Sequence, residues 1–159
     1  MGDMKPLLLA AGAALVLTTL SVPAASGAPG AKTVVVVDTQ FIDGPNQVLQ
    51  ASGPLASCTE VLDLEGDGVQ ISTNKVLFFG VKEFGCEGGS TVTVSYEATS
   101  NFIASEHRPG RTSGTWTVVD STLDGVESGG GVLKGDARCE PVAGADGCII
   151  DTFRGHVSG

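Results

Sequence analysis

The feature that most constrains this chain is a repeated alternation of β-branched or aromatic residues with polar ones, interrupted throughout by glycine. The sequence has 159 residues, of which 23 are glycine. After the first 28 residues, no stretch keeps the i, i+3, i+4, i+7 apolar spacing of an amphipathic helix. Period-two alternation is typical of strands with one buried face. We therefore expect strands at residues 33–38, 58–64, 69–71, 75–84, 91–99, 112–119, 131–135 and 149–157.

Two local patterns refine this expectation. The segment D-L-E-G-D-G at 63–68 has the composition of a turn and predicts a break between two strands. The run from Val76 to Phe79 is the densest apolar segment among the strands and predicts burial on both faces.

Seven or eight closely spaced strands in one small domain leave two all-β architectures, a closed antiparallel barrel or a two-sheet sandwich. A closed barrel has no exposed edges, and its curvature requires glycines at bends and bulges. The glycines at 129–131 and the isolated Gly80, Gly114, Gly135 and Gly155 suit such curvature. We therefore predict an antiparallel closed β-barrel of about eight strands, with the β-sandwich as the alternative.

The N-terminus has the pattern of a secretory signal peptide. Lys5 precedes an apolar run from Leu7 to Leu20, and small residues occupy 21–28, where cleavage is expected between 24 and 28. The apolar run is shorter than the ~20 residues of a membrane span, so a retained anchor is the less favoured alternative. We predict a secreted protein with three regions: a signal peptide at 1–26, an N-terminal strand and connecting loop at 27–57, and the main part of the barrel at 58–159.

The charge excludes some partners. Asp and Glu number 18 against 9 Lys and Arg, giving a net charge of −9. Such a surface disfavours nucleic acid and anionic membranes. No phosphate-binding, zinc-protease or nucleophile motif occurs, so no cofactor is expected. The oligomeric state is left open.

All four cysteines follow the predicted leader, at Cys58, Cys86, Cys139 and Cys148. An even number in an exported domain indicates disulfides, with three possible pairings. We favour Cys139–Cys148, because the Gly-, Pro- and Ala-rich residues between them make a closable loop, and this leaves Cys58–Cys86. Zinc is disfavoured because no Cys-x₂-Cys pair is present.

Several glycine and aromatic patterns resemble those of the allene oxide cyclase and dirigent-like barrel superfamily, in particular its small secreted bacterial members. The similar segments lie at 86–92, 114–119, 123–125, 129–135 and 151–155. The resemblance spans residues 58–157 and departs from the pattern at 121–123, where a Gly-Thr-Gly turn is expected. It implies a barrel, in a superfamily that includes cyclases and proteins that steer radical coupling, and it transfers no catalytic residue. A family of secreted antibiotic-carrying apoproteins shares the size, acidity and four cysteines, but those proteins are sandwiches.

Asp63, Glu65 and Asp67, followed by Gly68, copy the first half of a calcium loop. The position of the expected bidentate glutamate is Asn74, and no flanking helices are indicated. A hairpin turn is therefore the preferred interpretation, and no metal is predicted.

Asp151 is the candidate acid or base, because regular alternation places it on the same face as Ile149, Phe153 and Val157. A carboxylate in an apolar row has a raised pKa. The preferred interpretation is nonetheless structural, with a bulge, an edge or a hydrogen bond relieving the charge.

Three further side chains are candidate ligand contacts. Tyr96 and Trp116 head apolar rows and either line a ligand cavity or fill the barrel themselves. Arg154, with His156, lies on the face opposite Asp151 and forms either an anion site or a solvated surface.

The leading functional hypothesis is a secreted barrel that binds a small apolar ligand in or near its interior. The alternatives are a cyclase or isomerase-type enzyme that uses Asp151, and an extracellular structural or protein-interaction module. The sequence leaves open whether the chain is an enzyme.

Overall fold

The computed structural model describes residues 30–39, 45–103, 108–136 and 149–159. The predicted signal peptide and the predicted Cys139–Cys148 disulfide lie outside these residues. The described part of the chain contains no helix with the length and hydropathy that a membrane span requires.

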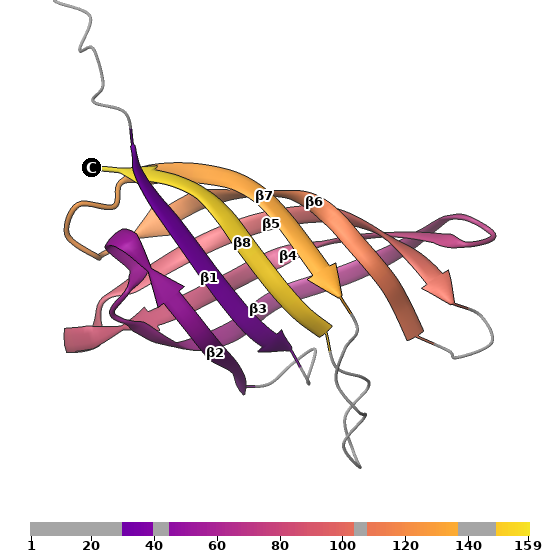
Figure 1. Ribbon diagram of the computed structural model, residues 1–159, viewed down its shortest axis with the longest axis horizontal. Helices are drawn as coiled ribbons and strands as arrows, with labels where there is room; N and C mark the ends of the chain where they lie inside the picture. Colours follow the sequence, from indigo (N-terminus) through magenta and orange to yellow (C-terminus); the bar gives the residue numbers. More distant parts are fainter. Residues whose placement is uncertain (1–29, 40–44, 104–107, 137–148) are drawn as a thin grey trace, which may run out of the picture.

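Eight strands, each antiparallel to its neighbours, form one closed sheet (Figure 1). Consecutive strands pair with each other, and β8 pairs with β1 to close the ring. The predicted antiparallel barrel is therefore confirmed, and the sandwich is not formed. The strands are β1 (Ala31–Thr39), β2 (Pro45–Ser52), β3 (Cys58–Ser72), β4 (Lys75–Cys86), β5 (Thr91–Ile103), β6 (Arg108–Ser121), β7 (Ser128–Asp136) and β8 (Ile149–Ser158).

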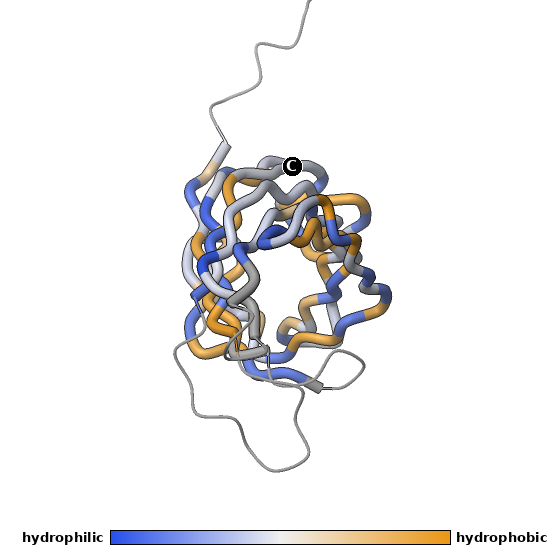
Figure 2. Tube along the Cα trace, turned by 90° about the vertical axis from the view of Figure 1, so that its right-hand side faces the viewer, coloured by the Kyte–Doolittle hydropathy of each residue, from blue (hydrophilic) through white to orange (hydrophobic). Residues whose placement is uncertain are grey.

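Alternation decides which side chains face inward. Figure 2 views the strands nearly end-on, as a ring along which hydrophobic and hydrophilic residues interchange. On β5, for example, Val92, Val94 and Ala98 are buried, as the period-two pattern predicts. Two short 3₁₀ turns, Gly53–Leu55 (η1) and Glu87–Gly89 (η2), complete the described structure.

One end of the barrel is plugged by apolar side chains. Leu55 of η1 and Val126 of the β6–β7 connection are each 1% exposed and belong to the core. Phe153 packs edge-on against Phe84 and Trp116, with ring centroids 5.6 and 6.1 Å apart. A disulfide joins Cys58 at the start of β3 to Cys86 at the end of β4, as predicted. We call this the plugged end.

The structure corrects the prediction of a turn at residues 63–68. These residues lie inside β3, which pairs with β4 from Cys58 to Ser72 and is shifted by a bulge between Asp63 and Glu65. The long partner strand supplies hydrogen bonds that outweigh the turn-like composition, and the reversal comes at residues 73–74. A second difference is β2, a strand without alternating apolar residues that is held between β1 and β3.

The prediction that the run from Val76 to Phe79 is buried on both faces is wrong. Val76, Leu77 and Phe78 are half-buried and Phe79 is 38% exposed. The β3–β4 hairpin projects beyond the neighbouring strands at the end opposite the plug (Figure 1), so its outer face meets solvent. We call this the hairpin end.

Candidate functional site

The barrel interior holds an ion pair between β3 and β4. Lys82 and Asp63 face each other in the strand register, and the Lys82 ammonium donates to Asp63 Oδ1. Their side chains are 3% and 5% exposed. Asn46 of β2 donates from Nδ2 to Asp63 Oδ2 at 2.7 Å. Both oxygens of the Asp63 carboxylate are therefore engaged, as burial of a charge requires.

Asp151 of β8 is a second buried carboxylate in the same interior. It is 9% exposed and shares the inward face with Phe153 and Val157, as the alternation predicts. No hydrogen bond to its carboxylate is formed by any of the described residues. Burial raises the pKa of Asp151 from 3.8 to about 6; Lys82 lowers it and Asp63 raises it. We call Asp63, Lys82 and Asp151 the interior charged cluster.

A glycine makes room beside Asp151. The register pairs Asp151 with Gly135 of β7, and Gly135 with Thr112 of β6. A Cβ at Gly135 would lie 2.5 Å from Asp151 Oδ1 and 2.9 Å from Thr112 Cβ. The Thr112 hydroxyl is buried and has no hydrogen-bond partner in the described structure. Two polar groups without partners thus flank the same point of the interior wall.

The row through Asp151 continues to the hairpin end. Thr112 pairs with Ser100 of β5, and Ser100 pairs with Val76 of β4. Ser100 is fully buried, whereas Val76 and the next inward residue of β4, Phe78, are half-buried. The inward face is therefore partly accessible to solvent at this end, where Val76 and Phe78 supply apolar surface beside the polar Ser100 and Thr112.

Tyr96 of β5 lies beside the Lys82–Asp63 ion pair and opposite Gly80 of β4 in the strand register. The Lys82 ammonium is 5.5 Å from the centroid of its ring, within the range of a cation–π contact. Its hydroxyl lies over Gly80, where a Cβ would approach it to 2.8 Å. The pKa of Tyr96 is raised by burial and, to a smaller degree, by Asp63 and Asp151. The phenol is therefore a neutral hydrogen-bonding group.

Trp116 fills the barrel. It is 2% exposed, its Nε1 donates to the Arg154 carbonyl at 3.3 Å, and its ring packs on Phe153. Its edge lies against Gly155, where a Cβ would come within 2.9 Å of Cζ2. Of the two interpretations given to this residue, packing is the one that the structure shows.

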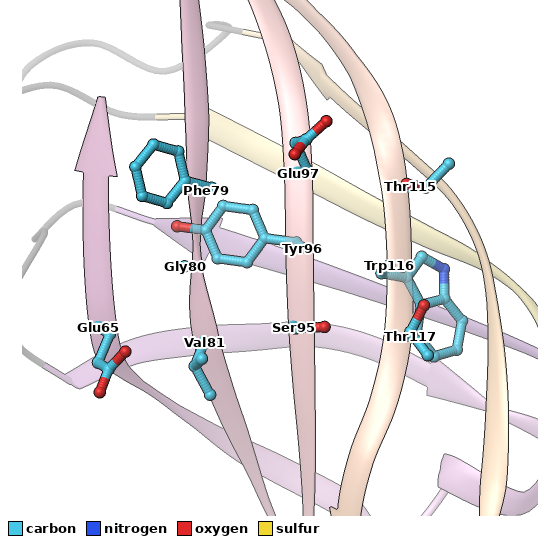
Figure 3. Close-up of a pocket in the computed structure, with 10 residues that line it drawn as sticks. All are labelled: Glu65, Phe79, Gly80, Val81, Ser95, Tyr96, Glu97, Thr115, Trp116 and Thr117. Atoms are coloured by element: carbon cyan, nitrogen blue, oxygen red, sulfur yellow. The ribbon is translucent and has the colours of Figure 1, made fainter. Parts of the chain in front are cut away.

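A shallow depression of about 400 Å³ crosses β4, β5 and β6 (Figure 3). Phe79, Glu97 and Thr115, which line it, are exposed on the outer face. Tyr96 and Trp116 also line it, each flanked in sequence by two residues that line it as well. The full lining is Glu65, Phe79, Gly80, Val81, Ser95, Tyr96, Glu97, Thr115, Trp116 and Thr117.

The remaining sequence candidates do not join the interior. The side chains of Arg154 and His156 are exposed on the outer face of β8. Glu65 and Asp67 are exposed on β3, whereas Asp63 points inward to Lys82, so the three calcium candidates do not converge. Across the described ranges, no group of three His, Cys, Asp or Glu side chains is placed to hold a metal ion.

Sequence reasoning missed Lys82, Asn46 and Thr112. For Lys82 a signal existed, because period-two counting places it on the same face as Phe84 and Phe78. A lysine within an apolar row indicates a buried counter-charge. No such signal identified Asn46, because β2 itself was not predicted.

Comparison with known proteins gives no relative: the chain matches no family model, and neither a curated protein nor a solved structure is significantly similar to it. The resemblance to the allene oxide cyclase and dirigent-like superfamily therefore stays a prediction.

Proposed function

We propose that this protein is a secreted binding protein that holds a small molecule inside its barrel, at the end where Asp151 lies. The proposal refines the expected apolar ligand to one with an apolar body and a single polar group. Export is supported by the N-terminal leader pattern and by the disulfide in the barrel.

One observation supports the proposal above all others. Among the described residues, the Thr112 hydroxyl is a buried polar atom without a hydrogen-bond partner, and Asp151, which is 9% exposed, receives no hydrogen bond on its carboxylate. Both side chains flank the same glycine. Buried polar groups are almost always hydrogen-bonded, and the exceptions gather at functional sites. A ligand group between them would satisfy both.

The apolar body of the ligand has a matching wall. Val76 and Phe78 face inward from β4 and are half-buried, so part of their surface is available for contact. An apolar wall with a few convergent polar groups is the usual composition of a small-molecule site.

The test is native mass spectrometry of the protein purified from culture medium, followed by a fragment set screened by NMR. We expect a co-purified molecule or fragment shifts centred on Asp151 and Thr112. Arg154→Gln, on the outer face, should bind as the wild type does. If no molecule co-purifies and no fragment perturbs the inward residues, the proposal fails and an extracellular structural or interaction module is left.

A second candidate is a cyclase or isomerase in which Asp151 acts as the acid or base. The observation that favours it is the Asp151 pKa of about 6, because both protonation states are then populated near neutral pH. Turnover of the co-purified molecule, lost in Asp151→Asn although that molecule still binds, would distinguish catalysis from binding.

A further inference from the structure

We infer that the polar group of the ligand is a cationic amine. This inference rests on the proposed interior binding site and adds the chemical class of what it takes. It follows from the charges, the hydrogen-bonding capacity and the surroundings of the site, in that order.

Counted over the described residues, the interior charged cluster has one positive charge fewer than it has negative charges. It has two carboxylates and one ammonium, and the ammonium donates to Asp63 rather than to Asp151. Asn46 occupies the other oxygen of Asp63, so Asp63 needs no further donor. Of the two carboxylates, the ionised Asp151 is the one to which no described residue donates, and a second cation would make the cluster neutral.

The hydrogen-bonding groups match an ammonium. A primary ammonium has three donors and no acceptor. At this site the Asp151 carboxylate accepts hydrogen bonds, and the Thr112 hydroxyl can accept one, since it has no other partner in the described structure. Asp151 Oδ1 and Thr112 Cβ both lie within 3 Å of the point where a Gly135 Cβ would stand. Both side chains therefore border the same stretch of the wall, and we expect one nitrogen to reach both.

Within the part of the chain that the structure describes, the surroundings of Asp151 supply no other counter-charge. Its register partners on the two flanking strands, Val37 of β1 and Gly135 of β7, are uncharged. The titratable groups that act on it across the barrel are Lys82 and Asp63, and Tyr96 is coupled to it as a neutral phenol. A ligand carboxylate would meet repulsion from both aspartates.

The experiment uses three probes with one apolar body: benzylamine, benzyl alcohol and benzoate. Dissociation constants are measured by NMR titration of the intact mature protein at pH 7.5 and 4.5. We expect benzylamine to bind at least about tenfold more tightly than the alcohol at pH 7.5, with benzoate weakest. At pH 4.5, where Asp151 is protonated, the preference should shrink to less than about threefold.

Variants separate charge from shape. Asp151→Asn should abolish the preference for benzylamine at pH 7.5 while benzyl alcohol binds as before. Thr112→Val, which keeps the side-chain shape, should weaken benzylamine several-fold at both pH values. Arg154→Gln is the control and should change neither. Circular dichroism verifies that each variant is folded.

Each contrary result has one meaning. Equal binding of amine and alcohol at pH 7.5 overturns the amine assignment but leaves interior binding intact. Tighter binding of benzoate also overturns it and points to Lys82 as the recognising group. If none of the three probes binds, the amine assignment fails, whereas the proposed binding function is decided separately by the molecule that co-purifies with the secreted protein.

Discussion

Replacing Asp151 with asparagine is expected to stabilise the folded protein at neutral pH. The carboxylate is buried and receives no hydrogen bond from the described residues, and its pKa rises from 3.8 to about 6 on folding. Each unit of difference corresponds to about 1.4 kcal/mol, so ionised Asp151 costs the fold about 3 kcal/mol above pH 6. Asparagine has nearly the same shape and no charge to bury. The attraction of Lys82 lowers this cost but does not reverse it, because burial has the larger effect on the pKa of Asp151.

The pH dependence follows from which state loses its proton first. In the unfolded chain Asp151 ionises near pH 4, whereas in the folded chain it keeps its proton until about pH 6. Between these values the unfolded state has already lost its proton, so folding requires that one be taken up and stability falls as pH rises. The advantage of the variant should therefore be near zero below pH 4, grow between pH 4 and 6, and stay constant above.

The assay is urea unfolding at pH 4, 5, 6 and 7, followed by the fluorescence of the single tryptophan, Trp116, which is 2% exposed in the fold. Asp120→Asn, at an exposed position of β6, is the matched control and should show no such trend. The reasoning is refuted if Asp151→Asn is less stable than the wild type at pH 7, or if the difference between them does not vary with pH.

Three further perturbations test the remaining interior contacts. Lys82→Met should destabilise the fold by about 3–5 kcal/mol, because the buried Asp63 carboxylate loses its ammonium partner, and Lys82→Met combined with Asp63→Leu should recover most of the loss in urea unfolding. Reduction of the disulfide between β3 and β4 should cost about 3–4 kcal/mol on the chain-entropy estimate for its separation of 28 residues, measured as a drop in Tm with and without reductant. Gly80→Ala should lower the Tm by several degrees, since its Cβ would clash with the Glu65 carbonyl oxygen and the Tyr96 hydroxyl. Gly85→Ala, whose Cβ would come no closer than 3.3 Å to the Glu60 side chain, should not, and equal effects would contradict this account.

Most of the strands could be predicted from the sequence because their periodicity is local. The alternation at 91–99 and 149–157 specifies which residues share a face, and the structure places those faces as predicted. The predictions that failed concern segments whose structure depends on pairing with another strand. The turn-like residues 63–68 became strand because β4 is long enough to pair with all of them. The polar segment of β2 became strand because β1 and β3 lie on either side of it.

The candidate site was only partly predictable for the same reason. That Asp151 belongs to an apolar row is visible in the sequence around it. That the row faces inward, and that Lys82 and Asp63 approach Asp151 from other strands, depends on how the sheet closes. Thr112 was visible as a polar residue in a strand, but its unmet hydroxyl is a property of the closed barrel.

The two ends of the barrel interior are built on different principles, and the difference bears on function. At the plugged end, aromatic rings and a disulfide fill the space, and no buried side-chain polar atom of the described residues there lacks a hydrogen-bond partner. Toward the hairpin end, the inward-facing positions of β3, β4 and β8 are instead occupied by Asp63, Lys82 and Asp151. Apolar residues of similar volume at these positions would often make a fold more stable. A domain of this kind has a free energy of unfolding of about 5–15 kcal/mol, and the ionised Asp151 carboxylate lowers it by about 3 kcal/mol. A bound cation that pairs with this carboxylate would restore part of the lost stability. Ligand binding and stability should therefore be coupled: at one fixed concentration an amine should raise the Tm of the wild type more than that of Asp151→Asn, and equal shifts in both proteins would show that the carboxylate is not what the ligand recognises.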